Sequence, residues 1–288
     1  MYIGIDGCRG GWVAARLEAP SGGPIRPGAA LGAAAVPVRL RWELTDDLTT
    51  WWAGGEIRAR RVLLDMPLGL QRRGRRACDV QAMERLGPVG RRRCFHAPSW
   101  RALARWRQLH EQEAPGADTD ESDTRGRARR RVIYDQVNAC NAEDTGLNLT
   151  PPGYALLPRI DEARRFVIGC GLADQVREAH PELMFMALGG GELLPTKHAA
   201  EGLAARRRLL LQALPESAAA LEAASAGLGA GRLRAKPDDL YDAAVLAVAG
   251  LLLDEQPQRA IWLPPRGGTA PRLRDPDGLP VEIVGVLP

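Results

Sequence analysis

Two aspartates, Asp6 and Asp65, have the sequence setting of carboxylates that do chemistry. Asp6 lies near the end of an apolar strand predicted over residues 2–7, and Asp65 ends a second apolar stretch that begins at Arg61. Ligand sites in open α/β sheets form beyond the carboxyl ends of strands, so we expect both carboxylates at one edge of a sheet. Asp-Gly is also ordinary hairpin-turn chemistry, and an aspartate before Met-Pro also suits a turn, so these alternatives stay open.

Three further carboxylates have settings that suit the same site. Asp239 and Asp242 lie three residues apart at the start of a helix predicted over residues 239–255, so they share one helix face. Acids in a first turn also oppose the helix dipole, and capping is the simpler role for Asp239 alone. Asp242 lies among apolar residues, where a buried charge needs a metal or an arginine as its partner. Glu182 lies in an apolar stretch, residues 176–187, that predicts a strand.

Carboxylates that converge from different elements suggest metal-dependent chemistry. Mg²⁺ and Mn²⁺ prefer oxygen ligands, and phosphodiester hydrolysis by two metals about 3.5–4 Å apart needs several of them. One metal lowers the pKa of the attacking water, and the other stabilises the leaving oxygen. We therefore predict Mg²⁺ or Mn²⁺ as cofactor, with Asp6, Asp65 and Asp242 as ligands. Asp239 and Glu182 are predicted as auxiliary ligands or bases.

Basic residues are grouped along the chain, although the formal net charge of its 288 residues is only +4. The stretch from Arg72 to Arg93 contains eight arginines. Such blocks suit phosphate binding, and a solvated surface accounts for them equally well. Nucleic acid, DNA or RNA, is the predicted partner. The residues predicted to bind this substrate are Arg9, Arg72, Arg73, Arg75, Arg76 and Lys197.

The composition argues against several other classes of protein. Five cysteines without a CxxC pair argue against a disulfide framework and a structural zinc site. The chain enters a strand directly, without the basic and apolar regions of a signal peptide. Its longest apolar run, residues 243–253, is far shorter than the ~20 residues that span a bilayer. We therefore expect a cytoplasmic protein that does not enter the membrane.

The order of predicted elements indicates an α/β fold. Strands are predicted over residues 2–7, 11–18, 34–44 and 61–67, and two closing strands, over 260–263 and 281–286, are expected to complete the sheet. The Arg-rich residues 71–170 are mostly helical in pattern, which predicts a helical insertion within a single domain of residues 1–288. Another helix is predicted over 198–214.

Seven short motifs together resemble a bacterial and archaeal family of predicted nucleases with the RNase H fold. Each motif alone is weak, but their order and spacing are specific. They are Gly4-Ile5-Asp6-Gly7, Leu64-Asp65-Met66-Pro67, Arg76-Ala77-Cys78-Asp79, Leu157-Pro158-Arg159-Ile160-Asp161-Glu162, His180-Pro181-Glu182, Thr196-Lys197-His198 and Asp238-Asp239-Leu240-Tyr241-Asp242.

This resemblance covers almost the whole chain and implies an RNase H-like mixed sheet flanked by helices. It also implies a metal-dependent nuclease core, with Asp6, Asp65, Asp239 and Asp242 at metal-ligand positions. One stretch departs from the family pattern: a Ser-Ser-Val-Phe-like sequence is usual where this chain has residues 92–95, Arg-Arg-Cys-Phe.

The predicted function is hydrolysis of phosphodiester bonds in nucleic acid, and two other functions fit the same core. A phosphotransferase of the actin-like fold would need two copies of the core and a second phosphate loop. A non-catalytic nucleic-acid or nucleotide-binding module would keep the fold and use the arginines. Stabilisation by ATP would identify the first, and binding without metal-dependent cleavage would identify the second.

Overall fold

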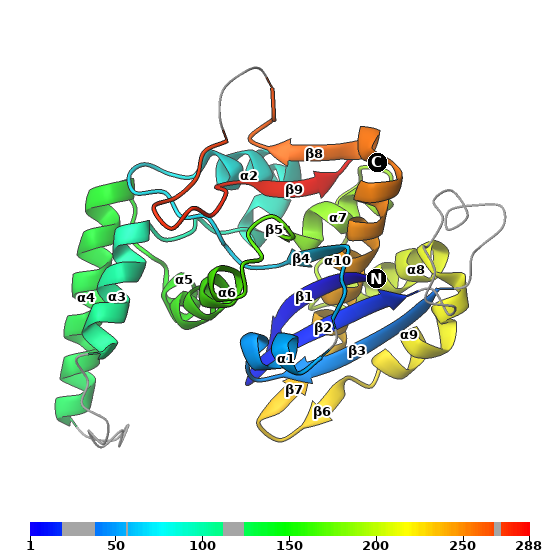
Figure 1. Cartoon of the computed structure of the whole chain (residues 1–288), viewed down its shortest axis with the longest axis horizontal. Coiled ribbons are helices and arrows are strands. Elements are labelled where there is room, and N and C mark those ends of the chain that lie inside the picture. The colour runs from blue at the N-terminus through cyan, green and yellow to red at the C-terminus, as the bar shows by residue number, and fades with distance from the viewer. Residues whose placement is uncertain (19–37, 56, 112–123, 268–271) are drawn as a thin grey trace.

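A mixed five-stranded sheet, in the order β3-β2-β1-β4-β5, forms the centre of the molecule (Figure 1). The computed structural model describes residues 1–18, 38–55, 57–111, 124–267 and 272–288. The strands are β1 (Tyr2–Cys8), β2 (Gly11–Glu18), β3 (Arg39–Thr45), β4 (Arg61–Leu64) and β5 (Val176–Glu178). β2 pairs antiparallel with β1 and with β3, whereas β1 with β4 and β4 with β5 pair parallel. The predicted α/β class, a mixed sheet flanked by helices, is confirmed.

Helices pack on both faces of the sheet (Figure 1). On one face α10 (Pro237–Glu255) crosses β1, β2 and β4 and is accompanied by α7 (Pro181–Leu188), α8 (Ala200–Ala213) and α9 (Ala218–Ala224). The other face is covered by α1 (Leu48–Gly54) and α6 (Leu157–Gly169). Because β1 and β4 lie inside this sandwich, their side chains are largely apolar on both faces, as expected for buried strands. The edge strand β5 is also buried, but it contains the charged residues Arg177 and Glu178.

Between β4 and β5 the described chain is helical, in agreement with the helical pattern of residues 71–170; residues 112–123 of this stretch lie outside the described part. The remaining helices here are α2 (Ala77–Gly90), α3 (Trp100–Glu111), α4 (Thr124–Thr145) and α5 (Pro151–Ala155), with a short 3₁₀ turn at Arg91–Arg93. Figure 1 shows α3 and α4 paired with each other beyond the edge of the sheet. Phe166 of α6 belongs to the same hydrophobic cluster as Ile5 and Leu64, and this cluster extends to Leu103 of α3 and Val137 of α4.

The strand predicted over residues 176–187 is wrong beyond Glu178. The chain turns into helix α7 at Pro181, and the Nδ1 atom of His180 accepts a hydrogen bond from the Glu182 N–H at the helix start. Proline is pre-organised for the first helical position. The apolar run that follows is almost wholly buried, so it has no polar residues to show whether hydrophobic positions repeat with the period of a strand or of a helix.

The two closing strands are correct as strands but do not complete the central sheet. β8 (Ala260–Leu263) and β9 (Ile283–Val286) pair antiparallel as a separate sheet, joined to the core by one bridge between Ala179 and Val284. A second small sheet contains β6 (Leu228–Ala230) and β7 (Leu233–Ala235). Residues 34–37 of the predicted third strand lie outside the described part. No helix within the described residues is long and apolar enough to cross a membrane.

Candidate functional site

The register between β1 and β4 brings Asp6 and Asp65 together. The strands run parallel with Ile5 opposite Leu64, and the Asp65 N–H donates to the Ile5 carbonyl oxygen at 2.9 Å. Asp6 and Asp65 are therefore the next residues on adjacent strands. Side chains alternate between the faces of a strand. Ile5 and Leu64 belong to the hydrophobic cluster on the α6 face of the sheet. Asp6 and Asp65, each one residue further along, therefore point to the opposite face, which α10 covers.

Gly4 lets α10 approach β1 closely enough to deliver Asp242 to the same place. A Cβ atom at Gly4 would lie 2.0 Å from the carbonyl oxygen of Ala243 and 2.5 Å from the amide nitrogen of Ala247. Only glycine allows such an approach of two backbones. Gly4 and Asp6 are two residues apart on β1 and so share a face, while Asp242 directly precedes the contact residue Ala243. The start of α10 is thereby fixed above the two strand-end carboxylates.

The three aspartates share a buried region with Lys197, which lies in the loop between α7 and α8. Asp242 is 1% exposed and Asp6 is 7% exposed, and the Lys197 ammonium donates to Asp242 Oδ2 at 2.5 Å. Burial raises the pKa of Asp65 to about 7 and that of Asp242 to about 6, although Lys197 opposes both shifts. Burial and the charges of the other two aspartates raise the pKa of Asp6 well above its usual range. This region has more negative charge than its one ammonium neutralises.

One carboxylate oxygen of Asp242 is buried without a partner. Its Oδ2 is held by Lys197, whereas Oδ1 makes no hydrogen bond within the described part of the chain. A buried anionic oxygen without a partner is costly, and a hard oxygen donor is what Mg²⁺ and Mn²⁺ bind. The chemistry of Asp6, Asp65 and Asp242 therefore fits a divalent cation. In the present arrangement no three His, Cys, Asp or Glu side chains of the described residues are grouped closely enough to hold a metal, and Lys197 supplies the positive charge.

A cavity of about 360 Å³ opens beside Asp65 and Asp242. Asp6 is buried and is not among its lining residues. The cavity also has cationic and imidazole side chains in its wall, which suit an anionic ligand. These are Arg76, Arg92, Arg93, His180, Lys197 and His198.

Glu182 lines this cavity, but two arginines bind its two carboxylate oxygens. Arg206 donates to Oε1 at 2.6 Å and Arg93 donates to Oε2 at 2.7 Å. Burial alone would raise the pKa of Glu182, but the two arginines outweigh burial and lower it. With both oxygens engaged, Glu182 is placed to position the arginines and α7 rather than to act as the predicted auxiliary ligand or base.

Asp239 has the capping role that was the simpler alternative. Its Oδ2 accepts a hydrogen bond at 2.8 Å from the Lys236 N–H, at the start of α10. It faces a different, more open cavity, together with Gly7, Arg9 and Lys236. Asp239 still contributes to the raised pKa of Asp6, so it belongs to the electrostatic surroundings of the site. Arg9, a predicted substrate contact, lies on this second side of Asp6.

Arg76, predicted to contact substrate, is instead a buried structural residue. It is 3% exposed, and its guanidinium forms ion pairs with Asp79 and with Glu178, the latter at 2.5 Å. It also donates to the carbonyl oxygen of Gly69 at 2.8 Å. Its donors are therefore used within the protein, and we remove Arg76 from the phosphate-binding set. Glu178 is the last residue of β5, and Asp65 directly follows β4. Glu178 was missed from the sequence because its strand was predicted to continue to residue 187.

The other arginines of this run are distributed over different surfaces. Arg72 and Arg73 line a cavity formed with residues 273–276, and the Arg72 guanidinium lies 5.2 Å from the ring centre of Trp100. Arg75 lines a further cavity beside α4 and α5. Two arginines that were not singled out, Arg92 and Arg93, line the carboxylate cavity. The signal for them was the departure of residues 92–95 from the family pattern.

The comparisons with known proteins identify a family whose function is not known. A search of curated proteins and a search of solved structures each found no significant match. A family model matches residues 4–264, which contain every motif of the sequence analysis, from Gly4 to Asp242. The chain therefore belongs to DUF429, a family described as a protein of unknown function.

Proposed function

We propose that the chain is a Mg²⁺- or Mn²⁺-dependent nuclease that hydrolyses phosphodiester bonds in nucleic acid through a two-metal carboxylate site. One observation carries this proposal. Asp6, Asp65 and Asp242 converge from β1, β4 and α10, their pKa values are raised, and one buried Asp242 oxygen has no partner in the described structure. Perturbed carboxylates in a cleft are typical of catalytic sites, because chemistry requires charges that folding alone does not favour.

In this proposal each side chain has a defined task. Asp6, Asp65 and Asp242 would hold the two metals, which when bound would lower the pKa of a water and neutralise charge that develops on the phosphate. Lys197, which lies beside Asp242, and the exposed Arg92 hold the phosphate within the same cavity. The strands and the helix start keep the carboxylates in place, and catalysis requires such rigid positioning.

A cleavage screen tests the proposed activity. Single- and double-stranded DNA and RNA are incubated with the protein in Mn²⁺, in Mg²⁺ and in EDTA. We expect cleavage of at least one substrate with metal only, its loss in Asp65→Asn, and its retention in the matched control Asp238→Asn. Cleavage that persists in Asp65→Asn would point to a contaminating nuclease, and no cleavage under any condition would reject the proposal.

Metal binding has a readout that does not depend on activity. A cation that binds only the folded protein stabilises it by about 2.7 kcal/mol at ~100 times its Kd. We expect millimolar Mn²⁺ to raise the melting temperature of the parent protein and of Asp238→Asn but not of Asp65→Asn. Equal melting curves of the parent with Mn²⁺ and with EDTA would contradict the metal site.

The non-catalytic binding module is a second candidate, favoured by the position of Lys197. Its ammonium already sits at Asp242 and, despite burial, its pKa is raised by Asp242 and Asp6. A phosphate could then be bound by Lys197 and Arg92 without any metal. Oligonucleotide binding without metal-dependent cleavage would select this function. The phosphotransferase alternative gains no support, since it needs two copies of the core and the described chain has one five-stranded sheet.

A further inference from the structure

A second cavity, of about 510 Å³, adjoins the carboxylate cavity. The two cavities share the residues 92–95 as a common wall, so that Arg92, Arg93, Cys94 and Phe95 line both. A ligand with two chemically different parts could therefore occupy both cavities across this wall.

The lining of the second cavity differs from that of the first. The first contains Asp65, Glu182 and Asp242, whereas no acidic residue is among the described residues that line the second. Its wall is largely apolar and includes one aromatic ring. The apolar lining residues include Met83, Phe95, Leu147, Leu149, Pro152 and Leu156. Three arginines, Arg75, Arg92 and Arg93, also line it, so the cavity suits a flat apolar group that is joined to a phosphate.

His96 adds a polar group without a partner to this apolar wall. Its Nδ1 atom is buried and makes no hydrogen bond to any described residue. Burial lowers the pKa of His96, so the ring is neutral at neutral pH and one nitrogen accepts a hydrogen bond while the other donates. Asn148, exposed at the same cavity, carries a further amide group. The exposed Asn148 amide can pair with the polar edge of an uncharged heterocycle, and the His96 ring lines the same wall.

We propose that the second cavity binds a nucleobase of the substrate, next to the phosphodiester held at the carboxylates. This inference rests on the proposed function and narrows its substrate class. A base that remains stacked in a duplex cannot enter a pocket, so the substrate is single-stranded nucleic acid or a nucleotide turned out of a duplex. Arg92 and Arg93, on the shared wall, lie where the phosphate that joins the two parts would pass.

Binding of two strands of equal charge in EDTA tests this inference without any cleavage. The probes are a short fluorescent oligothymidylate and an abasic strand of the same length, so phosphate contacts are the same in both. We expect the strand with bases to bind about tenfold more tightly, the order of one base stacked on an aromatic side chain. Equal affinity for the two strands would overturn the inference.

Two cavity variants and a matched control locate the effect. Asn148→Trp fills the cavity from its exposed rim, and His96→Phe removes both ring nitrogens while keeping the bulk. Asn148→Trp is expected to bind the two strands equally and His96→Phe to prefer bases less than the parent, while Val132→Trp, on an exposed position of α4, keeps the full preference. A folded Asn148→Trp protein that prefers bases as the parent does would overturn the cavity assignment.

The outcomes separate this inference from the nuclease proposal. Base-dependent binding without metal-dependent cleavage would reject the nuclease and leave the base cavity in place. Metal-dependent cleavage with equal affinity for both strands would reject only the base cavity. Asp65→Asn should keep the preference for bases, because Asp65 lies outside the second cavity.

Discussion

Asp275 and Asp242 are both deeply buried aspartates, 7% and 1% exposed, yet their surroundings differ in every respect that matters for a charge. Asp275 Oδ2 accepts from Arg164 at 2.5 Å and from the Leu70 N–H at 3.0 Å. Its Oδ1 accepts from two more backbone N–H groups, of Asp277 at 3.0 Å and of Leu279 at 2.9 Å. Asp242 has one ammonium on one oxygen and no partner in the described structure on the other.

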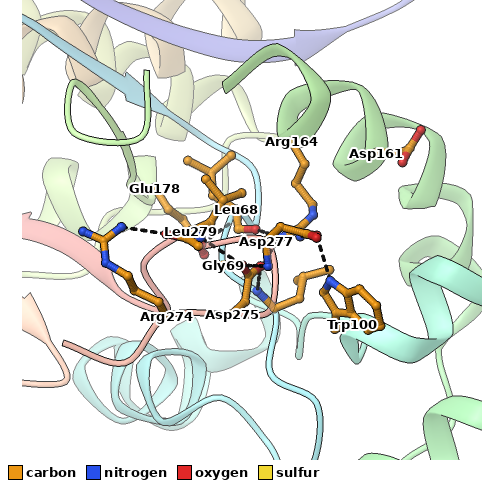
Figure 2. Close-up of polar contacts among 12 residues, drawn as sticks. Leu68, Gly69, Trp100, Asp161, Arg164, Glu178, Arg274, Asp275, Asp277 and Leu279 are labelled. Atoms are coloured by element: carbon orange, nitrogen blue, oxygen red, sulfur yellow. Dashed lines mark hydrogen bonds and ion pairs between the residues drawn. The ribbon is translucent and has the colours of Figure 1, made fainter. Parts of the chain in front are cut away.

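Figure 2 shows how the Asp275 cluster joins distant parts of the fold. Arg164 reaches from α6 to Asp275 and to Asp277, both at 2.5 Å, and Trp100 donates to Asp277 at 2.7 Å. Although burial opposes the shift, Trp100 and Arg164 lower the pKa of Asp277. Arg164 also donates to the Leu68 carbonyl oxygen, so the cluster holds the segment that follows Asp65.

The difference separates a structural charge cluster from a candidate functional one. Where each carboxylate oxygen has its donors, burial is compensated and the cluster joins loops into one structure. Where three carboxylates share one ammonium, burial and repulsion raise their pKa values. Such carboxylates add little to the stability of the folded protein. Uncompensated carboxylates of this kind are candidates for ligand binding or catalysis, because a bound cation can supply the missing positive charge.

The largest expected effect is loss of stability when the compensated cluster is broken. Asp275→Asn is nearly isosteric but leaves Arg164 without its buried counterion and turns an amide donor toward other donors. Breaking a buried ion pair typically costs about 3–5 kcal/mol. We expect urea unfolding at pH 7 to show a loss of this order. A loss below ~1 kcal/mol would remove the contrast between the two clusters.

The matched change at the uncompensated site should act on activity instead. Asp242→Asn removes one repelling charge, so the metal-free protein should be at least as stable as the parent. Loss of a key electrostatic group should lower metal-dependent cleavage by about 10²-fold or more. Apo melting and turnover are measured together, with Asp238→Asn as a control that changes neither by much. A destabilised but fully active Asp242→Asn protein would make Asp242 structural and withdraw α10 from the site.

The two clusters should respond to pH with opposite sign. The pKa values of Asp65 and Asp242, about 7 and about 6 in the folded protein, lie above the ordinary value near 3.9. Their contribution to stability is therefore fully present below about pH 4 and is lost as pH rises through 6 and 7. The pKa of Asp277 is lowered, so its contribution is present at neutral pH and is lost in acid.

Melting of two variants across pH 3–9 in EDTA measures this difference. We expect Asp65→Asn to flatten the fall in stability between pH 5 and 8. We expect Asp277→Asn to be less stable than the parent at neutral pH, with a difference that shrinks in acid. The stabilisation by Mn²⁺ should be larger at pH 8 than at pH 5, since the carboxylates must lose protons to bind it. A parent protein whose metal-free stability rises between pH 5 and 8, with the Asp65→Asn curve parallel to it, would contradict the raised pKa values.

The smallest effect concerns the arginines outside both clusters. Each phosphate contact that is lost lowers the slope of log affinity against log salt by about 0.7–0.9. We expect this decrease for Arg92→Ala, at the carboxylate cavity, and none for Arg72→Ala, whose side chain lies against Trp100 in a different cavity. Equal decreases in this slope for both variants would show that Arg72 contacts the substrate. The binding surface would then extend to the cavity that Arg72 lines with residues 273–276.

The sequence by itself determined the elements that carry the candidate site. The apolar strands that end in Asp6 and Asp65 and the buried helix that carries Asp242 were predicted within a few residues of β1, β4 and α10. These signals are local, because strand and helix periods and strand-end acids can be recognised in a short window. Local signals failed at residues 181–187, where an almost wholly buried run has no face to show, and at β8 and β9, whose partners are set by packing.

Only the tertiary structure decided which charge is compensated and by what. Lys197 pairs with Asp242 across 45 residues, Arg76 with Glu178 across 102, and Arg206 with Glu182 across 24. Arginines with the same sequence character became a buried ion pair, a cavity wall or a surface residue. The reason is physical: the free energy of a charge depends on its burial and its neighbours, and packing across the sheet brings those neighbours together.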